Sequence, residues 1–148
     1  MSPLARHMIK LFGKVHKALY GLSGTRVFNN VGQMPTLLLT ATGRRSGKPR
    51  TVPLLYLETD DGYAIVASFA GAPDHPAWYR NLQKDPQASV QIADRVVPVM
   101  ASTASADEKH VLWPQFTDMY PDYDNYQRDT DRDIPVVLLN GISESRSY

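Results

Sequence analysis

The stretch TLLLTATGRRSGKPRTVPLLYLE, residues 36–58, decides the fold. Its apolar beginning, Thr36 to Thr42, is flanked by β-branched threonines and predicts a buried strand. A second strand is predicted from Arg50 to Glu58, after a glycine-punctuated basic loop over residues 43–50. Pro53 lacks a backbone N–H, so the second strand is expected to lie at a sheet edge or to contain a bulge there. The short connection favours antiparallel pairing of the two strands.

The rest of the chain continues this pattern of short strands and short turns. Further strands are predicted over residues 63–69, 88–93, 95–103 and 134–140, the second and third of these forming a hairpin that turns at Ala93-Asp94. One helix is predicted to begin at Pro76 and to continue until Asp85-Pro86 stops it, and another to run from Ala106 toward Tyr120, beginning with a capping box of Ser105 and Glu108. About six antiparallel strands with inserted helices predict a small, mainly β, closed barrel rather than a doubly wound sheet.

The N-terminal residues 1–24 are predicted to form an amphipathic helix that precedes a barrel domain over residues 25–148. Apolar residues recur there at steps of three and four, and four bases form a stripe beside them: Arg6, Lys10, Lys14 and Lys17. Such a helix can lie on anionic lipid, and it can equally pack against the barrel or a partner subunit. A peripheral membrane contact through residues 1–22 is therefore one of two expectations.

Composition narrows the classes of function. Hydrophobic residues make up 43% and charged residues 21%, as in ordinary globular proteins, and the net charge is only +1, so we expect no nucleic-acid partner. Cysteine is absent, which excludes disulfides, thiolate catalysis and cysteine-ligated metals, and fits a reducing cytoplasm. The histidines show no metal-ligand spacing, so no metal is expected. No apolar run reaches the length of a spanning helix.

The basic loop over residues 43–50 is the strongest candidate for ligand binding. Its glycines allow close approach of the backbone, and its arginines can grip phosphate or carboxylate through forked donors. A lysine followed by proline and a strand does not make a Walker loop, which begins a helix. Composition alone also fits a solvated turn, so the anion site is a hypothesis at this point.

Four motifs in order resemble those of the deazaflavin (coenzyme F420)-dependent nitroreductases, and the resemblance runs from about Thr36 to Asn140. They are LLTATGRRSG with Pro49-Arg50, APDHPAWYRNL over residues 72–82, Tyr120-Pro121 with Tyr123 and Tyr126, and Thr130-Asp131-Arg132 before IPVV at residues 134–137. The resemblance implies a split β-barrel of the flavin-reductase or FMN-binding type. It also implies bound coenzyme F420 as the cofactor and hydride transfer from its reduced ring to an organic acceptor.

The resemblance assigns roles to individual residues. It implies that the cofactor phosphate binds Arg45, Ser46, Arg50 and Thr51, with Gly47 in the same loop and Arg44 and Lys48 nearer the outer glutamates. It implies that the ring is bordered by Pro53 and Leu54 on one side, by Ser68, Phe69, Ala70 and Gly71 on the other, and by Trp78 and Asn81 from the short helix. From the general behaviour of large aromatic residues, Trp78 could equally be a packing anchor.

The candidate catalytic residues are three tyrosines and a serine. By resemblance, Tyr120, Tyr123 and Tyr126 flank the acceptor side of the ring together with Ser68. A phenol stays protonated at neutral pH and can donate a hydrogen bond to an acceptor oxygen. The alternative for the tyrosines is core packing beside Trp113 and Phe116. Where some relatives carry tyrosine and lysine, this chain has Leu55 and Phe69, which predicts a more apolar acceptor pocket.

The predicted activity is reduction of an activated C=C bond, a quinone or a nitroaromatic ring. The cofactor supplies the difficult step, which explains why no nucleophile–base pair or paired carboxylates stand out. Two alternatives remain open at this stage. One is an FMN-binding enzyme of the pyridoxamine-phosphate-oxidase type, and the other is a non-catalytic F420 carrier. A homodimer is expected by analogy with other split barrels.

Overall fold

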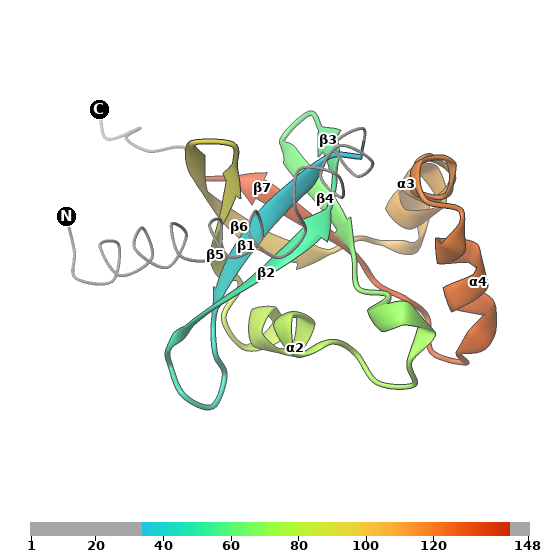
Figure 1. The fold of residues 1–148 in the computed structure, drawn as a ribbon, viewed down its shortest axis with the longest axis horizontal. Coiled ribbons are helices and arrows are strands. Elements are labelled where there is room, and N and C mark those ends of the chain that lie inside the picture. The colour runs from blue at the N-terminus through green and yellow to red at the C-terminus, as the bar shows by residue number, and fades with distance from the viewer. Residues whose placement is uncertain (1–33, 143–148) are drawn as a thin grey trace, which may run out of the picture.

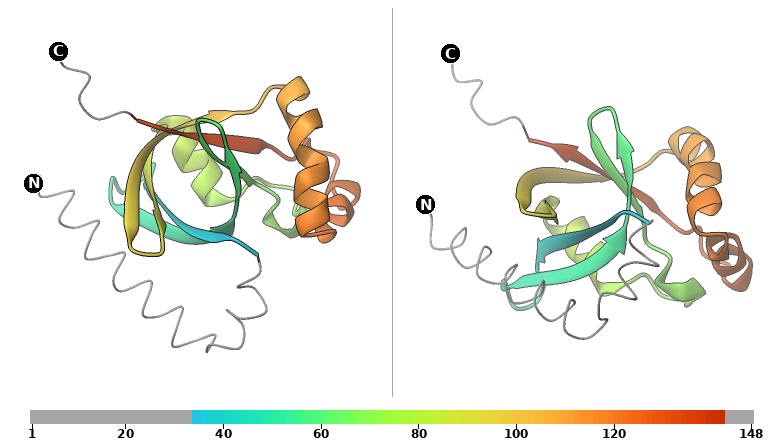
Figure 2. Two further views of the ribbon diagram at one scale, coloured as in Figure 1. Left: turned by 90° about the horizontal axis from the view of Figure 1, so that it is seen from above. Right: turned by 45° about the horizontal axis from the view of Figure 1, so that its top comes forward.

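An antiparallel sheet curled into a half-barrel forms the body of the chain (Figures 1 and 2). The computed structural model describes residues 34–142. The strands are β1 (Thr36–Thr42), β2 (Pro49–Leu55), β3 (Leu57–Thr59), β4 (Gly62–Val66), β5 (Gln87–Ile92), β6 (Arg95–Thr103) and β7 (Val136–Gly141). The helices are a 3-10 turn η1 (Phe69–Gly71), α2 (Ala77–Lys84), α3 (Ala106–Met119) and α4 (Asp122–Asp129). The predicted N-terminal helix and the membrane contact assigned to it lie outside the described residues.

The strand order β2-β1-β5-β6-β7-β4-β3, with every pair antiparallel, confirms the predicted mainly β split barrel. β2 is at one edge, where Pro53 pairs with Leu38 in an unbroken register. Of the two expectations for Pro53, the sheet edge is therefore confirmed, and the strand contains no bulge there. The hairpin of β5 and β6 turns at Ala93-Asp94 as predicted, and Ala93 has a φ of 54°.

The single strand predicted over residues 50–58 is two strands, so the described sheet has seven strands instead of about six. β1 begins at Thr36, which pairs with Leu55, so the chain beyond Leu55 has no further partner in β1. Tyr56 is buried and donates its N–H to the carbonyl of Pro35 at 3.1 Å. β3 then pairs with β4, which explains the extra strand.

The strand predicted over residues 63–69 ends three residues early. Ala67, just beyond β4, donates its N–H to the carbonyl of Pro135 at 2.9 Å. Phe69, Ala70 and Gly71 then have φ values of 44°, 53° and 77°, which no strand can contain. The residues after Val66 therefore form a tight left-handed turn.

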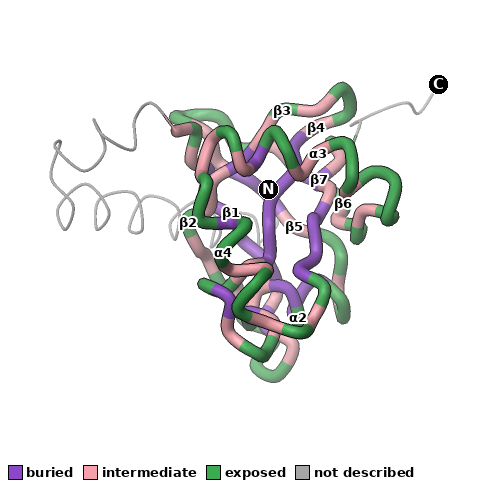
Figure 3. Tube along the Cα trace, turned by 90° about the vertical axis from the view of Figure 1, so that its right-hand side faces the viewer, coloured by how far each residue is buried: buried purple, intermediate pink, exposed green. Residues whose placement is uncertain are grey.

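The barrel core is filled from the alternate residues of the strands that point inward. Leu37, Leu39, Ile65, Val99 and Leu139 are almost inaccessible to solvent. Helix α2 lies across one end of the barrel, where Tyr79 and Leu82 join the same cluster (Figure 2). Figure 3 shows the buried segments along the strands and the exposed ones in the turns and outer helices.

Helices α3 and α4 pack against the other face of β4 and β7 in a second apolar cluster around Phe116, Tyr123 and Ile134. The predicted capping box of α3 is confirmed: Ser105 Oγ accepts from the Glu108 N–H at 3.1 Å, and a Glu108 carboxylate oxygen accepts from the Ser105 N–H at 2.9 Å. α3 ends before Pro121, as expected, and the following helix α4 was not assigned from sequence. Among residues 34–142, no helix is long and apolar enough to cross a membrane.

Candidate cofactor and acceptor site

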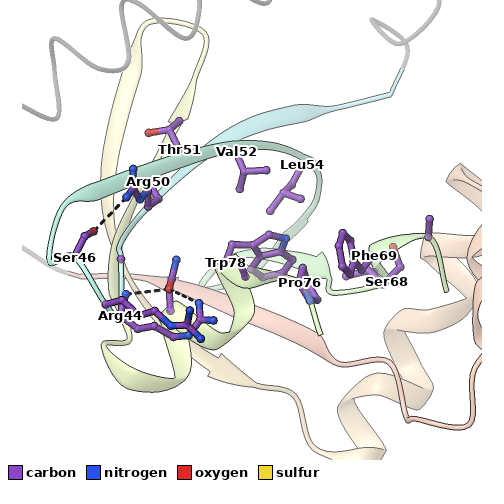
Figure 4. A pocket seen from close by; sticks show the side chains of 16 residues that line it. Arg44, Ser46, Arg50, Thr51, Val52, Leu54, Ser68, Phe69, Pro76 and Trp78 are labelled. Carbon is purple, nitrogen blue, oxygen red and sulfur yellow. Dashed lines mark hydrogen bonds between the residues drawn. The ribbon is translucent and has the colours of Figure 1, made fainter. Parts of the chain in front are cut away.

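A cavity of about 700 Å³ lies between the β1–β2 loop, strand β2, the η1 turn and helix α2 (Figure 4). This volume is in the range of small-molecule and cofactor sites. Its lining residues are Gly43, Arg44, Arg45, Ser46, Arg50, Thr51, Val52, Leu54, Val66, Ser68, Phe69, Ala70, Pro76, Ala77, Trp78 and Asn81. The cavity therefore has one cationic end and one apolar end.

The basic loop is closed by its own backbone. The N–H of Gly43 donates to the carbonyl of Lys48 at 2.8 Å, and the N–H of Gly47 donates to the carbonyl of Gly43 at 2.8 Å. Gly47 has a φ of 71°, which favours glycine. A Cβ at Gly43 would lie 2.8 Å from Ser46 Oγ and 3.1 Å from the Lys48 carbonyl oxygen. The loop is therefore closed by its own hydrogen bonds, and its backbone favours glycine through close contacts at Gly43 and a left-handed φ at Gly47.

Three arginines give the cationic end its charge. Arg44, Arg45 and Arg50 all line the cavity, and the described lining contains no acidic residue. Arg50 Nη2 donates to Ser46 Oγ at 3.3 Å, whereas Arg45 has no hydrogen-bond partner among residues 34–142. Guanidinium groups without a carboxylate nearby present forked donors to an anion such as phosphate.

Asn81 connects helix α2 to the basic loop. Its Oδ1 accepts from the backbone N–H of Arg44 at 3.0 Å and from Arg44 Nη1 at 3.1 Å, and the side chain is buried. Lys84, one turn later, donates from Nζ to the carbonyl of Arg44 at 2.8 Å. α2 therefore orients Arg44 through both its backbone and its side chain.

Replacing Asn81 with leucine is expected to lower the free energy of unfolding by about 1–3 kcal/mol, because the partly buried Arg44 N–H loses its acceptor. N81D retains an acceptor oxygen and is the matched control. Urea denaturation followed by circular dichroism measures both variants. Equal stability of N81L and the unmodified protein would show that the loop does not depend on this contact.

The apolar end is built by strand β2, α2 and the η1 turn. Val52 and Leu54 face inward because they pair with the core residues Leu39 and Leu37 of β1. Figure 4 shows Trp78 between the arginine end and the opposite end, where Phe69 and Ser68 lie. Phe69 is 56% exposed, so its ring is accessible at the mouth of the cavity. A flat apolar ring fits between these walls.

The three tyrosines do not line this cavity. Tyr120 at the end of α3 and Tyr126 on α4 share a hydrogen bond between their hydroxyls at 3.0 Å. Tyr123 is buried, with its ring centroid 5.9 Å from that of Phe116 and 6.2 Å from that of Trp113. The structure therefore places Tyr123 in the packing that sequence analysis gave as the alternative.

Two of these phenols, those of Tyr120 and Tyr123, are held in the protonated form. The hydrogen bond to Tyr126 and then burial raise the pKa of Tyr120, and burial followed by the proximity of Tyr126 raises the pKa of Tyr123 to about 12. At neutral pH these hydroxyls are hydrogen-bond donors and not bases.

Tyr126 lies directly behind the η1 turn, since a Cβ at Gly71 would be 3.0 Å from its carbonyl oxygen.

Most of the residues predicted from sequence meet at the cavity. Those brought together are Arg44, Arg45, Ser46, Arg50, Thr51, Leu54, Ser68, Phe69, Ala70, Trp78 and Asn81. Gly47 lines a neighbouring groove of about 420 Å³ behind the loop, and Lys48, Pro53, Gly71, Tyr120, Tyr123 and Tyr126 line neither space. Pro53 pairs with Leu38 on the opposite face of β2 from Val52 and Leu54.

Sequence analysis missed five lining residues: Gly43, Val52, Val66, Pro76 and Ala77. Val52 could have been predicted from the sequence, because the period-two alternation of a strand places it on the same face as Arg50 and Leu54. Val66 could not have been predicted, since its place in the cavity lining depends on how β4 curls toward β2. The roles of all these residues toward a ligand stay predictions.

The curled antiparallel sheet and a cavity with a cationic and an apolar end define a split-barrel, cofactor-binding protein. The family model of the F420H(2)-dependent quinone reductases matches residues 12–141. The chain therefore belongs to that family, and it is an F420H2-dependent reductase with coenzyme F420 as its cofactor. This confirms the resemblance to F420-dependent reductases noted from the motifs.

Three relatives illustrate the similarity. The F420H(2)-dependent quinone reductase Rv1261c of Mycobacterium tuberculosis is 34% identical over 140 residues, covering 92% of this chain and 94% of the relative. A solved F420-H2 dependent reductase, FDR-A, is 43% identical with a TM-score of 0.66, covering 72% of this chain and 94% of the other. A second solved chain, described as a domain-swapped dimer, has the same identity and TM-score, with 72% of this chain and 80% of the other covered.

Proposed function

We propose that the cavity binds reduced coenzyme F420 with its phosphate at the β1–β2 loop and its ring between β2 and α2. The acceptor then docks at the η1 end of the cavity and is a quinone or a similarly flat, electron-poor compound. The observation that carries this proposal is the joining of three arginines, with no carboxylate in the described lining, to an apolar slot in one cavity.

The donor set fits the charge of the cofactor. Its tail carries a phosphate and several glutamyl carboxylates, which need more cationic donors than the single phosphate of FMN. Arg44, Arg45 and Arg50 surround one end of the cavity. The groove behind the loop shares Arg44 and Arg45 with the cavity and adds Lys84 and one carboxylate, that of Asp85. The tail is proposed to run from the cavity over the loop into that groove, where its outer carboxylates meet Lys84.

The cofactor, when bound, supplies a hydride equivalent from its ring carbon. The residues of the chain bind and orient both partners: Trp78 and Leu54 form the apolar walls, and Phe69 covers the acceptor from the solvent side. Ser68, the hydroxyl at the apolar end of the cavity, donates a hydrogen bond to the acceptor oxygen. The role of Tyr120, Tyr123 and Tyr126 near the acceptor stays a prediction from the resemblance.

An apolar acceptor end favours quinones over charged acceptors. Leu54, Phe69 and Trp78 offer carbon surface, and the nearest cation of the lining lies at the opposite end in Figure 4. Burial of a flat ring between aromatic and aliphatic walls is favourable, at roughly 25 cal/mol per Å² of apolar surface removed from water. Activated C=C bonds and nitroaromatic rings are the second candidates for the same slot.

Titration of the full-length protein with oxidised F420 and with FMN tests this proposal. F420 is expected to bind more tightly by about tenfold or more, because its additional carboxylates engage cations that a single phosphate leaves unpaired. Fluorescence of the deazaflavin and of the flavin gives the two Kd values. Tighter binding of FMN would overturn the cofactor assignment in this cavity. Oxidation of reduced F420 is then followed by absorbance with menadione and with a nitroaromatic compound as acceptors.

A homodimer is also proposed, because one solved relative is described as a domain-swapped dimer. Light scattering after size-exclusion chromatography measures the mass of the assembly. A mass of one chain across the concentration range would contradict it.

A further inference from the structure

Arg132, between α4 and β7, makes contacts with the cavity wall that the proposed function does not use. Its Nε donates to the carbonyl of Ala72 at 2.9 Å, Nη1 to that of Ala67 at 3.1 Å and Nη2 to that of Ser68 at 2.7 Å. Nη1 also lies 3.1 Å from Nδ1 of His75. One guanidinium therefore holds three backbone carbonyls of the segment 67–72 and touches a fourth residue.

The segment 67–72 needs such support because its backbone conformation is strained. Phe69 and Ala70 have φ values of 44° and 53°, a region that L side chains rarely adopt. Phe69 and Ala70 are also exposed, so little side-chain packing holds them in place. The segment itself forms two short hydrogen-bonded turns, from Gly71 N–H to the Ser68 carbonyl at 2.9 Å and from Ala72 N–H to the Phe69 carbonyl at 3.0 Å.

Arg132 is itself fixed from the other side. Gln127 Nε2 donates to the carbonyl of Arg132 at 2.8 Å, and Gln127 Oε1 accepts from the N–H of Ile134 at 3.0 Å and from Lys109 Nζ at 3.1 Å. Lys109 also pairs with Asp133 at 2.6 Å. Helices α3 and α4 therefore hold the backbone of Arg132 and the two residues after it, Asp133 and Ile134.

No ion pair explains the position of Arg132. Among residues 34–142 no carboxylate lies within salt-bridge distance of it, and burial lowers the pKa of its guanidinium. Carbonyls carry only partial charges, so an arginine that contacts carbonyls instead of a carboxylate has its charge only partly compensated. The three nitrogens of its planar guanidinium donate to three carbonyls of the same segment. A lysine, with a single ammonium nitrogen, cannot reproduce this geometry.

We propose that Arg132 is a positioning residue that fixes the segment 67–72, so that Ser68 and Phe69 stand correctly toward the bound ring and the acceptor. This inference rests on the proposed function for its kinetic consequences, but the contacts themselves can be tested without a ligand. Since the arginines of the basic loop belong to other elements, Arg132 is expected to influence turnover much more than cofactor affinity.

His75 makes the positioning sensitive to pH. To accept from Arg132, Nδ1 must carry no proton, so the imidazole is neutral with its hydrogen on Nε2. Burial, Arg132 and Arg80 lower the pKa of His75 and Asp74 raises it, with the first three prevailing, while the ring packs 4.8 Å from that of Tyr79. As pH falls below the ordinary histidine range and through this lowered pKa, a second cation forms beside Arg132 and the contact is lost.

Hydrogen exchange of the ligand-free full chain tests the role of Arg132. In R132K, peptide amides over residues 67–75 are expected to exchange faster by about tenfold, while those of β1 and β2 stay unchanged. Unchanged exchange in 67–75 would overturn the inference. A failure of the unmodified protein to bind F420 would overturn the proposed function instead and would leave this measurement standing.

Kinetics of R132K provide the second measurement. A misplaced wall is expected to lower kcat for quinone reduction by about 10²-fold while the Kd for F420 changes by less than about threefold. A parallel loss of affinity and turnover would contradict a positioning role, and full activity of R132K would show that the forked geometry is not needed.

H75Q keeps the test decisive if R132K does not fold. Glutamine retains an acceptor for Arg132 but does not titrate between pH 5 and 8. The unmodified protein is expected to keep its turnover at about pH 6.5, the ordinary pKa of histidine, and to lose it only as pH falls further, through the lowered pKa of His75, whereas H75Q is expected to keep it there too. Profiles that coincide over this range would overturn the role of His75.

Discussion

Replacing Arg45 and Arg50 together with alanine is expected to raise the Kd for F420 by about 10²–10³-fold, the largest effect on binding that we anticipate. Both side chains line the cationic end of the cavity, and the described lining contains no acidic residue that could pair with them in place of the ligand. Each lost charge-assisted hydrogen bond is worth about 1.5–3 kcal/mol. Fluorescence titration at several salt concentrations measures the change, and the salt dependence should be weaker in the variant.

The matched control for this experiment is R95A/R128A, which removes the same two charges away from the cavity. Arg95 contacts Tyr63 and Arg128 contacts Asn125, and neither lines the cavity. The control is expected to bind F420 like the unmodified protein. Equal weakening in both double variants would mean that overall charge, and not the loop, determines affinity.

Replacing Gly62 with alanine is expected to destabilise the fold by about 3–5 kcal/mol, the largest stability effect of any single substitution considered. A Cβ at Gly62 would lie 2.1 Å from the carbonyl oxygen of Leu139 and 3.1 Å from the Asn140 Cα. Both neighbours are backbone of the paired strand β7, so β4 and β7 would have to separate. Denaturation by urea and by heat measures the loss.

Gly141 is the control for this substitution. It lies on β7 near the same turn, but a Cβ there would have only the Asp61 carbonyl oxygen near it, at an ordinary 3.7 Å. G141A is expected to change stability by less than about 1 kcal/mol. A melting temperature of G62A equal to that of G141A would contradict the close approach of β4 and β7.

The sequence predicted the parts of the fold that depend on neighbouring residues. The alternating runs of β5 and β6, the turn between them at Ala93-Asp94 and the capping box at Ser105 are local signals, and each is confirmed. The change of partner after Leu55 could not be predicted, because it depends on where β1 begins, twenty residues earlier in the chain. The left-handed backbone conformation of Phe69 and Ala70 could not be predicted either, since neither residue type favours a positive φ.

The site was predictable where one segment builds it and not where distant segments meet. The basic loop showed its charge and its glycines in eight consecutive residues. Arg132 was noted only as part of a motif, because its carbonyl partners lie sixty or more residues earlier. Tyr123 has the same periodicity whether it faces an acceptor or packs on Phe116, and only the tertiary structure distinguishes the two.

Helix α2 has consequences for how this family can diversify. Tyr79 and Leu82 on one face are part of the barrel core, whereas Trp78 and Asn81, one position earlier in each case, belong to the cavity. An exchange in α2 that alters ligand preference therefore also disturbs packing. Phe69 stands on the surface with few neighbours to disturb. Natural variation in acceptor choice should accordingly accumulate in the turn after β4, while the helix opposite it changes slowly.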